Sequence, residues 1–140
     1  MPELIAPEGD RLAGVAAVLC PTLRCGDVVY LEGVIGAGKT TLVQACALAL
    51  GVREPVTSPT FSLAHRYAGT PPVTHLDLYR LEQQPLRDPG ELLDYLGDDV
   101  IAFVEWPGVG QSWLPPASAC VRIGLGAHGE RLIAVTLPSR

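Results

Sequence analysis

The residues best suited to chemistry form a glycine-rich segment. Residues 33–40 read Gly-Val-Ile-Gly-Ala-Gly-Lys-Thr and fit G-x-x-x-x-G-K-[ST], the phosphate-binding P-loop. Glycines let the backbone turn its N–H groups toward phosphate oxygens, where a Cβ would obstruct. Lys39, the only lysine in the chain, is expected to reach the β- and γ-phosphates, and the Thr40 hydroxyl to bind Mg²⁺. The predicted nucleotide-binding residues are Gly33, Gly36, Ala37, Gly38, Lys39, Thr40 and Thr41.

Two acidic residues stand at the ends of predicted strands. Asp77 ends a short strand at 73–77, and Glu105 directly follows the apolar run at 100–104. Ligands of open parallel α/β sheets bind outside the carboxyl ends of the strands, and P-loop proteins place a carboxylate near Mg²⁺ there. We therefore expect both acids beside Thr40. They are predicted to be catalytic residues together with Lys39, and magnesium-binding residues together with Thr40. Which acid contacts the metal directly stays open.

Each acid also has a simpler interpretation. Asp77 fits a turn or cap residue paired with Arg80, and Glu105 fits an exposed strand end. The second alternative is disfavoured because an acid directly after five apolar residues is costly to bury without a partner.

A hydroxyl-rich loop is the next candidate. Residues 57–60 read Thr-Ser-Pro-Thr, and a loop after the first crossover helix is where many P-loop proteins carry a switch that senses the γ-phosphate or Mg²⁺. Thr60 is the predicted catalytic member, although an ordinary Ser/Thr-Pro turn fits the same residues. Trp106 fits either a contact with the nucleotide or a partner, or a cap over the core.

The remaining segments position these residues. The strand 28–32 runs into the loop, the helix 39–50 leaves it, and the continuous apolar run at 100–104 is typical of a central strand covered on both faces. Other predicted segments are an irregular lead-in at 1–8, a helix at 10–19, strands at 61–67 and 73–77, a short helix at 90–96, a loop at 106–117, and strands at 119–125 and 131–137. The fold class is α/β: a P-loop NTPase-like three-layer fold with a mostly parallel central sheet and a C-terminal β-hairpin, in one domain over 1–140.

Composition excludes several classes of protein. A net charge of −5 argues against a domain whose main affinity is for nucleic-acid phosphates, although contact with RNA through a partner stays open. The four cysteines form no Cys-x-x-Cys pair, and Cys46 in an apolar helix suits a reducing compartment. The first residues lack a signal-peptide pattern, and no apolar run approaches the ~20 residues of a membrane span. We expect a cytoplasmic protein without a membrane association.

Five blocks of sequence, in this order, resemble one family. The P-loop is followed by SPTFSL at 58–63, HLDLYRL at 75–81, VEWP at 104–107 and LP at 114–115. Together they resemble the bacterial TsaE (YjeE) family, small P-loop ATPases of the tRNA threonylcarbamoyladenosine pathway, over nearly the whole chain. The P-loop alone is widely shared, whereas the other blocks at these separations are far more specific.

The resemblance implies an activity, cofactors and partners. It implies an ATPase that uses ATP and Mg²⁺ and acts with TsaD and TsaB, which attach a threonylcarbamoyl group to an adenosine of tRNA. In that family ATP hydrolysis supports turnover of the complex and does not transfer the group, so we expect weak or indirect contact with tRNA. The choice of ATP over GTP also rests on the resemblance, since no N-K-x-D motif occurs.

The resemblance also assigns residues. Thr40 and Glu105 match the Mg²⁺ ligands, Asp77 matches the second acid, and Thr60 matches the switch-like threonine. The chain departs from the family at Val34, where an acid is usual, and more mildly at Leu76, where Phe is usual. We expect the backbone cradle to survive, while the effect of Val34 on the hydrolysis rate stays open.

Two other functions fit the same loop. A small-molecule kinase would need an acceptor pocket and a lid, for which residues 82–98 are the only candidate, with a single arginine, Arg87. A nucleotide-gated interaction module without turnover fits the exposed-looking loop at 106–116. For the ATPase, we expect slow hydrolysis by the protein alone, because no arginine finger stands at an evident place.

Overall fold

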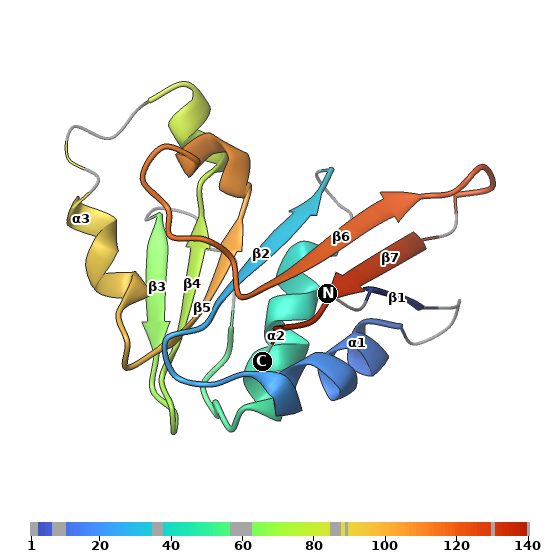
Figure 1. The fold of residues 1–140 in the computed structure, drawn as a ribbon, viewed down its shortest axis with the longest axis horizontal. Coiled ribbons are helices and arrows are strands. Elements are labelled where there is room, and N and C mark those ends of the chain that lie inside the picture. The colour runs from blue at the N-terminus through green and yellow to red at the C-terminus, as the bar shows by residue number, and fades with distance from the viewer. Residues whose placement is uncertain are drawn as a thin grey trace.

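One seven-stranded sheet organises the described part of the chain (Figure 1). This computed structural model describes residues 3–6, 11–34, 38–56, 63–84, 88, 90–129 and 131–139, with the side chains of 3–6 and Arg11 left out. The strands lie in the order β1-β7-β6-β2-β5-β4-β3. Their bounds are Glu3–Ala6 (β1), Val28–Gly33 (β2), Ala64–Tyr67 (β3), Val73–Asp77 (β4), Ile101–Glu105 (β5), Ala119–Leu125 (β6) and Arg131–Thr136 (β7).

The centre of the sheet is parallel and both of its edges are antiparallel. β2 pairs in parallel with β5 and with β6, and β4 pairs in parallel with β5. β3 runs antiparallel to β4, while β6 and β7 form an antiparallel hairpin. The predicted mostly parallel sheet with a C-terminal hairpin is therefore confirmed.

The predicted irregular lead-in at 1–8 is wrong where β1 lies. Its four residues pair antiparallel with β7, from Glu3 opposite Thr136 to Ala6 opposite Ile133. Without this strand, β7 would present a row of unpaired backbone N–H and C=O groups along an open edge. The partner lies at the other end of the chain, so the local pattern carried no sign of the pairing.

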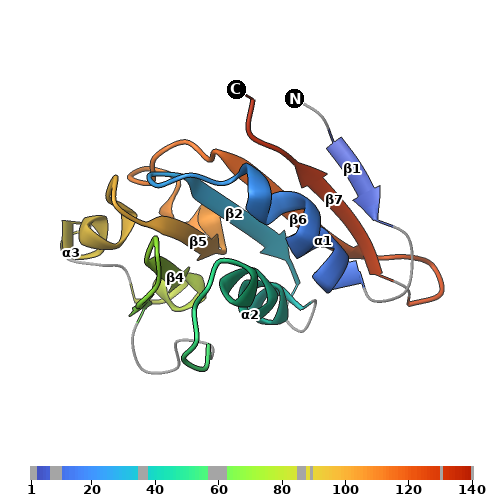
Figure 2. The ribbon, with the colours of Figure 1, turned by 90° about the horizontal axis from the view of Figure 1, so that it is seen from below.

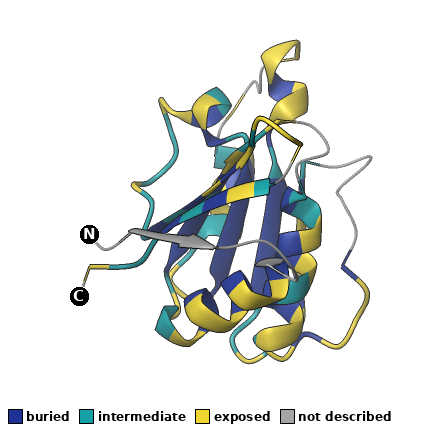
Figure 3. Cartoon of the chain, turned by 90° about the vertical axis from the view of Figure 1, so that its right-hand side faces the viewer, coloured by how far each residue is buried: buried dark blue, intermediate teal, exposed yellow. Residues whose placement is uncertain are grey.

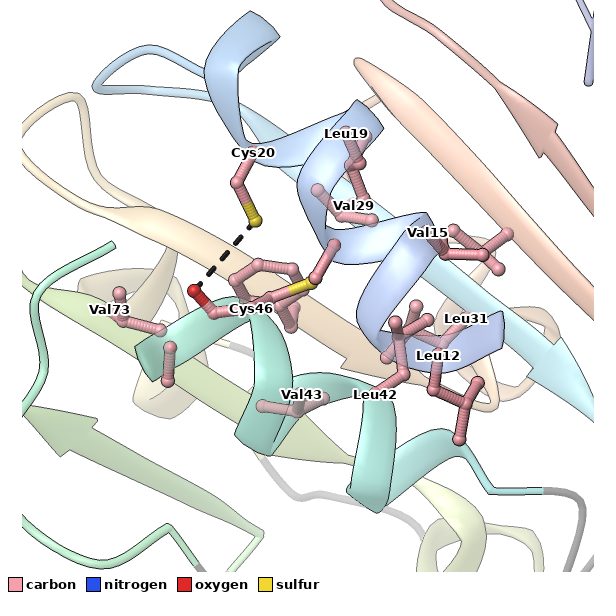
Figure 4. Close-up of a cluster of buried hydrophobic side chains, with 14 of the residues drawn as sticks. Leu12, Val15, Leu19, Cys20, Val29, Leu31, Leu42, Val43, Cys46 and Val73 are labelled. Carbon is pink, nitrogen blue, oxygen red and sulfur yellow. Dashed lines mark hydrogen bonds between the residues drawn. The ribbon is translucent and has the colours of Figure 1, made fainter. Parts of the chain in front are cut away.

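Helices α1 (Arg11–Leu19) and α2 (Lys39–Ala49) cover one face of the sheet and pack against each other (Figure 2). Both were predicted, with ends that differ by one residue. Figure 4 shows their buried side chains meeting over β2, with Leu12, Val15 and Leu19 from α1 and Leu42, Val43 and Cys46 from α2. This packing fixes α2 on the sheet and with it the position of Lys39, the first residue of α2.

Two cysteines, Cys20 and Cys46, contact each other in the core between α1 and α2. The Sγ of Cys20, at the start of the 3₁₀ helix η1 (Cys20–Thr22), donates to the carbonyl oxygen of Cys46 over 3.8 Å (Figure 4). The contact with Cys20, together with burial, raises the pKa of the Cys46 thiol. Both side chains are buried and act as small core groups.

Short helices cover the opposite face. They are η2 (Tyr79–Glu82), α3 (Gly90–Leu93), η3 (Asp94–Leu96) and η4 (Pro107–Gly110). Leu81 and Leu92 from this layer pack with Ala102 and Val104 of β5. Figure 3 shows the buried strands between the two outer layers, which confirms the three-layer arrangement. The short helix expected at 90–96 is observed as α3 followed by η3.

The segment after β5 is packed, in contrast to the exposed-looking loop that we expected. Pro107 and Gly110 are buried, and Trp113 and Leu114 lie against the core of this face. A Cβ on Gly110 would come within 2.9 Å of Leu78. Gly110 thus allows the segment to pack closely against Leu78. From its Gly/Pro-rich composition we had expected an open loop. Within the described residues, no helix has the length and apolar character to cross a membrane.

Candidate nucleotide-binding site

The site begins where α2 starts. Gly38 precedes the helix with φ 109°, a left-handed conformation that a residue with a Cβ rarely adopts. A Cβ there would also lie 3.2 Å from Leu12 and 3.4 Å from Cζ of Arg131. Backbone conformation and crowding therefore both require glycine at this position. The first N–H groups of a helix have no partner within the helix itself. That is the arrangement in which helix N-termini bind phosphate.

Lys39 points back to the end of β2 rather than into solvent. Its Nζ donates to the carbonyl oxygen of Gly33 over 2.5 Å and lies 3.7 Å from the centroid of the Trp106 ring. Burial lowers the pKa of the Lys39 amine, while the nearby Glu105 and Asp77 oppose this shift. The only lysine of the chain is therefore buried with two acids close enough to act on it.

Glu105 ends β5 as a buried acid with two partners. The residue is 3% exposed, and its Oε2 accepts hydrogen bonds from the Thr40 hydroxyl, over 3.1 Å, and from Nε2 of His75, over 2.5 Å. The alternative that Glu105 is an exposed strand end is therefore wrong. The P-loop threonine and the strand-end acid meet, as the sequence predicted.

Asp77 lies in register with Glu105 on the neighbouring strand. Its Oδ1 accepts the backbone N–H of Tyr79 over 3.1 Å, so the turn that we considered as an alternative does form. Burial is the main cause that raises the pKa of the Asp77 carboxyl, and Glu105 raises it further. A hollow of about 110 Å³, lined by Leu63, Asp77, Tyr79 and Arg80, opens beside it. Asp77 is thus half-buried and accessible at the edge of the site.

Trp106 takes an unusual backbone conformation to reach Lys39. With φ 60° it is the only residue other than glycine with a positive φ among the described residues, and such conformations are costly for a bulky side chain. Its ring also contacts Tyr79, with centroids 4.8 Å apart. Trp106 also packs against the core of this face, so the contact with Lys39 and the cap over the core coexist.

The structure adds two residues that the sequence analysis missed. His75 contacts Glu105 and is fully buried. The sequence held one indication of this role: His75 stands two residues before Asp77 on the same predicted strand, so both side chains lie on the same face of the sheet. Arg131, at the start of β7, lies beside Gly38. No local sequence pattern links Arg131 to Gly38, because their proximity depends on how the C-terminal hairpin packs near the start of α2.

Some predicted site residues receive no structural test. Gly36, Ala37 and Thr60 lie outside the described residues. Gly33 ends β2 and Thr41 is exposed on the first turn of α2. Val34 is 57% exposed, so its side chain can change without disturbing the core.

The oxygen donors of the site fit magnesium. The Thr40 hydroxyl and the carboxylates of Glu105 and Asp77 are hard ligands of the kind that Mg²⁺ prefers. Within the described residues no three His, Cys, Asp or Glu side chains form a metal cage. A nucleotide-bound Mg²⁺ typically takes one or two carboxylates plus phosphate oxygens, so the donors present match that mode of binding.

Fold and site together define the class: a P-loop type α/β protein, with its phosphate loop at the carboxyl edge of a mostly parallel sheet. The sequence also matches, over residues 7–133, the profile of the family described as threonylcarbamoyl adenosine biosynthesis protein TsaE. The chain belongs to the TsaE family.

Individual relatives agree with this assignment. Proteins named tRNA threonylcarbamoyladenosine biosynthesis protein TsaE are 34% identical in a Nostoc species, over 97% of this chain and 86% of the relative, and 35% identical in Bacillus subtilis, over 91% and 80%. A crystal structure of YdiB from Bacillus subtilis superposes with a TM-score of 0.76 at 28% identity, covering 99% of this chain and 86% of that one.

Proposed function

We propose that this chain is a Mg²⁺-dependent ATP hydrolase that acts with TsaB and TsaD in the biosynthesis of threonylcarbamoyladenosine in tRNA. The observation that carries the proposal is the hydrogen bond from Thr40 to Glu105 beside Lys39, in a chain of the TsaE family. Hydrolysis would support turnover of the partner complex, and the partners would transfer the group. The cytoplasm is the proposed compartment, because the names of the relatives refer to tRNA modification.

The residues have distinct tasks in this proposal. Backbone N–H groups at the start of α2 bind the phosphates, and Lys39 exchanges the Gly33 carbonyl for them and neutralises their charge. Thr40 and Glu105 supply the oxygens for Mg²⁺, which when bound lowers the charge that develops on the phosphates. Asp77, the more accessible acid, orients the attacking water.

The loop with Thr60 is proposed as a switch. A hydroxyl in this place of a P-loop protein senses the γ-phosphate or Mg²⁺. Replacing Thr60 by Val removes the hydroxyl at nearly constant volume. We expect Thr60→Val to bind ADP like the wild type and to lose the distinction between ATP and ADP.

The proposal is tested by measuring ATP hydrolysis with purified TsaB and TsaD for the wild type, Lys39→Ala and Glu105→Ala. We expect each variant to lose turnover by about a hundredfold or more, because each removes charge stabilisation at the transferred phosphate. Glu91→Ala removes an exposed acid of α3 and is the control for loss of one carboxylate. Turnover equal to the wild type in both Lys39→Ala and Glu105→Ala would refute the proposal.

The same assay separates the alternatives. Phosphate release that depends on a small-molecule acceptor would indicate a kinase, and nucleotide binding without turnover even with both partners would indicate an interaction module. For the ATPase we expect slow hydrolysis by the isolated chain and faster hydrolysis once TsaB and TsaD are added. Equal rates with and without the partners would contradict the proposed partnership.

A further inference from the structure

We propose that His75 is a positioning residue that orients the Glu105 carboxylate for magnesium, an inference that rests on the proposed function. His75 is 0% exposed and its Nε2 lies 2.5 Å from Oε2 of Glu105. The two residues stand on neighbouring parallel strands, β4 and β5. The ring reaches diagonally along the sheet, since the β5 residue in register with His75 is Phe103 and the β4 residue in register with Glu105 is Asp77.

Packing alone does not explain an imidazole at this position. Val73, two residues earlier on the same face of β4, belongs to the apolar core beneath α2, and so does the register partner Phe103. Burying a polar ring there is costly unless hydrogen bonds compensate. Within the described residues Nδ1 has no hydrogen-bond partner, so the ring gains only its bond to Glu105. An apolar side chain would fill the space without that cost.

The bond to Glu105 has a clear geometric effect. His75 Nε2 from β4 and the Thr40 hydroxyl from α2 both donate to the same oxygen, Oε2. Two donors from different elements define the torsion of the carboxylate far better than one would. No hydrogen bond from the described residues reaches the other oxygen, Oε1. Among the described residues, the carboxylate is therefore oriented through one oxygen, Oε2.

This arrangement predicts how the loss of His75 would be felt. Groups that orient metal-binding carboxylates typically change metal affinity or activity by about 10–100-fold when replaced. Among the described residues no hydrogen bond joins His75 to the P-loop backbone, so nucleotide affinity without metal should not depend on it. The expected signature is a loss of affinity for Mg²⁺ with unchanged binding of nucleotide in its absence.

The test compares two amides that differ by one methylene. Gln at position 75 can place its N–H near the position of Nε2, whereas Asn is too short to reach Glu105. Binding of a fluorescent ADP analogue is titrated with MgCl₂, and in parallel with EDTA. We expect His75→Asn to weaken the apparent Mg²⁺ affinity about 10–100-fold, His75→Gln to remain within about threefold of the wild type, and both to bind nucleotide normally in EDTA.

A third variant separates orientation from stability. His75→Phe keeps an aromatic ring and removes the unpaired Nδ1, so we expect its thermal unfolding without ligands to match or exceed the wild type, while its Mg²⁺ affinity falls like that of His75→Asn. Wild-type Mg²⁺ affinity in His75→Asn, or equal losses with MgCl₂ and EDTA, would overturn the inference. Absence of nucleotide binding by the wild type would instead refute the proposed function, so the two failures are distinguishable.

Discussion

The ends of β4 and β5 lie side by side and each carries an acid, yet their surroundings differ. Glu105 is buried, and its Oε2 accepts hydrogen bonds from a helix and from the neighbouring strand. Asp77, in register with it, is half-buried, accepts one backbone N–H, and borders a hollow. The β5 end is therefore a fixed position, and the β4 end is an adaptable one.

This difference suggests a division of labour between the two carboxylates. A ligand for Mg²⁺ benefits from a fixed orientation, because the ion demands near-ideal octahedral geometry. A group that orients water benefits from access and from a pKa near the working pH, and burial shifts the pKa of Asp77 upward from its ordinary value. We expect the two acids to fail in different ways when they are neutralised.

Neutralising Glu105 should have the largest effect. Glu105→Gln keeps the shape, and its amide oxygen can still accept the hydrogen bonds of Thr40 and His75. The second oxygen becomes an N–H₂ group, which cannot bind a cation, and the negative charge is lost. We expect turnover with TsaB and TsaD to fall by about a thousandfold, and the Mg²⁺ concentration for half-maximal rate to rise at least tenfold. A steady-state titration with MgCl₂ measures both. A normal Mg²⁺ requirement in this variant would break the comparison.

Neutralising Asp77 should reduce turnover by about a hundredfold, the lower range for positioned acid–base groups. Asp77→Asn retains the oxygen that accepts the N–H of Tyr79, so the turn should persist. In contrast to Glu105→Gln, we expect the Mg²⁺ requirement to stay within about threefold of the wild type, because Asp77 is proposed to act on water. If Asp77→Asn raised the Mg²⁺ requirement more than Glu105→Gln, the two roles would have to be exchanged.

Sequence reasoning predicted one acid more completely than the other. The run 100–104 identified a central strand, so the sequence alone was enough to place Glu105, at the end of that strand, near Thr40. The contact with His75 could not be predicted, because it depends on the diagonal offset between two strands that are far apart in sequence. Asp77 fitted both a site residue and a turn residue, and the structure shows that the turn and the position beside Glu105 coexist.

The fold also divides into elements that the sequence predicts and elements that it does not. Elements with a strong local pattern, such as the strand–loop–helix around Lys39 and the hairpin β6–β7, were predicted from periodicity and turn residues. β1 and the packed segment after β5 were not, because each is set by a distant partner: β7 in the first case and Leu78 in the second. The position of Arg131 beside Gly38 likewise depends on residues far apart in the sequence.

A smaller effect is expected on the pH dependence of stability. Because burial raises the pKa of Asp77 in the folded chain, the folded state binds more protons than the unfolded state from about pH 4, the ordinary carboxyl pKa, up to the raised value. Stability from this group is therefore present at low pH and is lost as pH rises through that window. Asp77→Asn cannot titrate, so it should gain stability relative to the wild type as pH increases.

Urea unfolding in EDTA between pH 4 and pH 7 measures this difference. We expect a gain below about 1 kcal/mol, since a half-exposed group is screened by solvent. Asp94→Asn, at an exposed acid of η3, controls for the loss of one negative charge. A relative stability of Asp77→Asn that falls with rising pH would contradict the assignment of Asp77 as the acid whose ionised form is disfavoured by folding.

Another modest effect concerns the aromatic pair that joins the two strand ends. Trp106 follows Glu105, Tyr79 follows Asp77 by two residues, and their rings meet beneath the Lys39 ammonium, which lies 3.7 Å from the indole centroid. Phosphate binding should draw Lys39 away from the indole and change its fluorescence. A cation–π contact is worth about 0.5–2 kcal/mol, so Trp106→Leu should alter the Kd for nucleotide by less than about thirtyfold.

The chain has two tryptophans, which allows a matched pair of variants for the fluorescence measurement. Trp113→Phe should retain the nucleotide-dependent signal and Trp106→Phe should lose it. Retention of the signal in Trp106→Phe would place the response at Trp113 instead, and the aromatic pair would then not link the fixed strand end to the adaptable one.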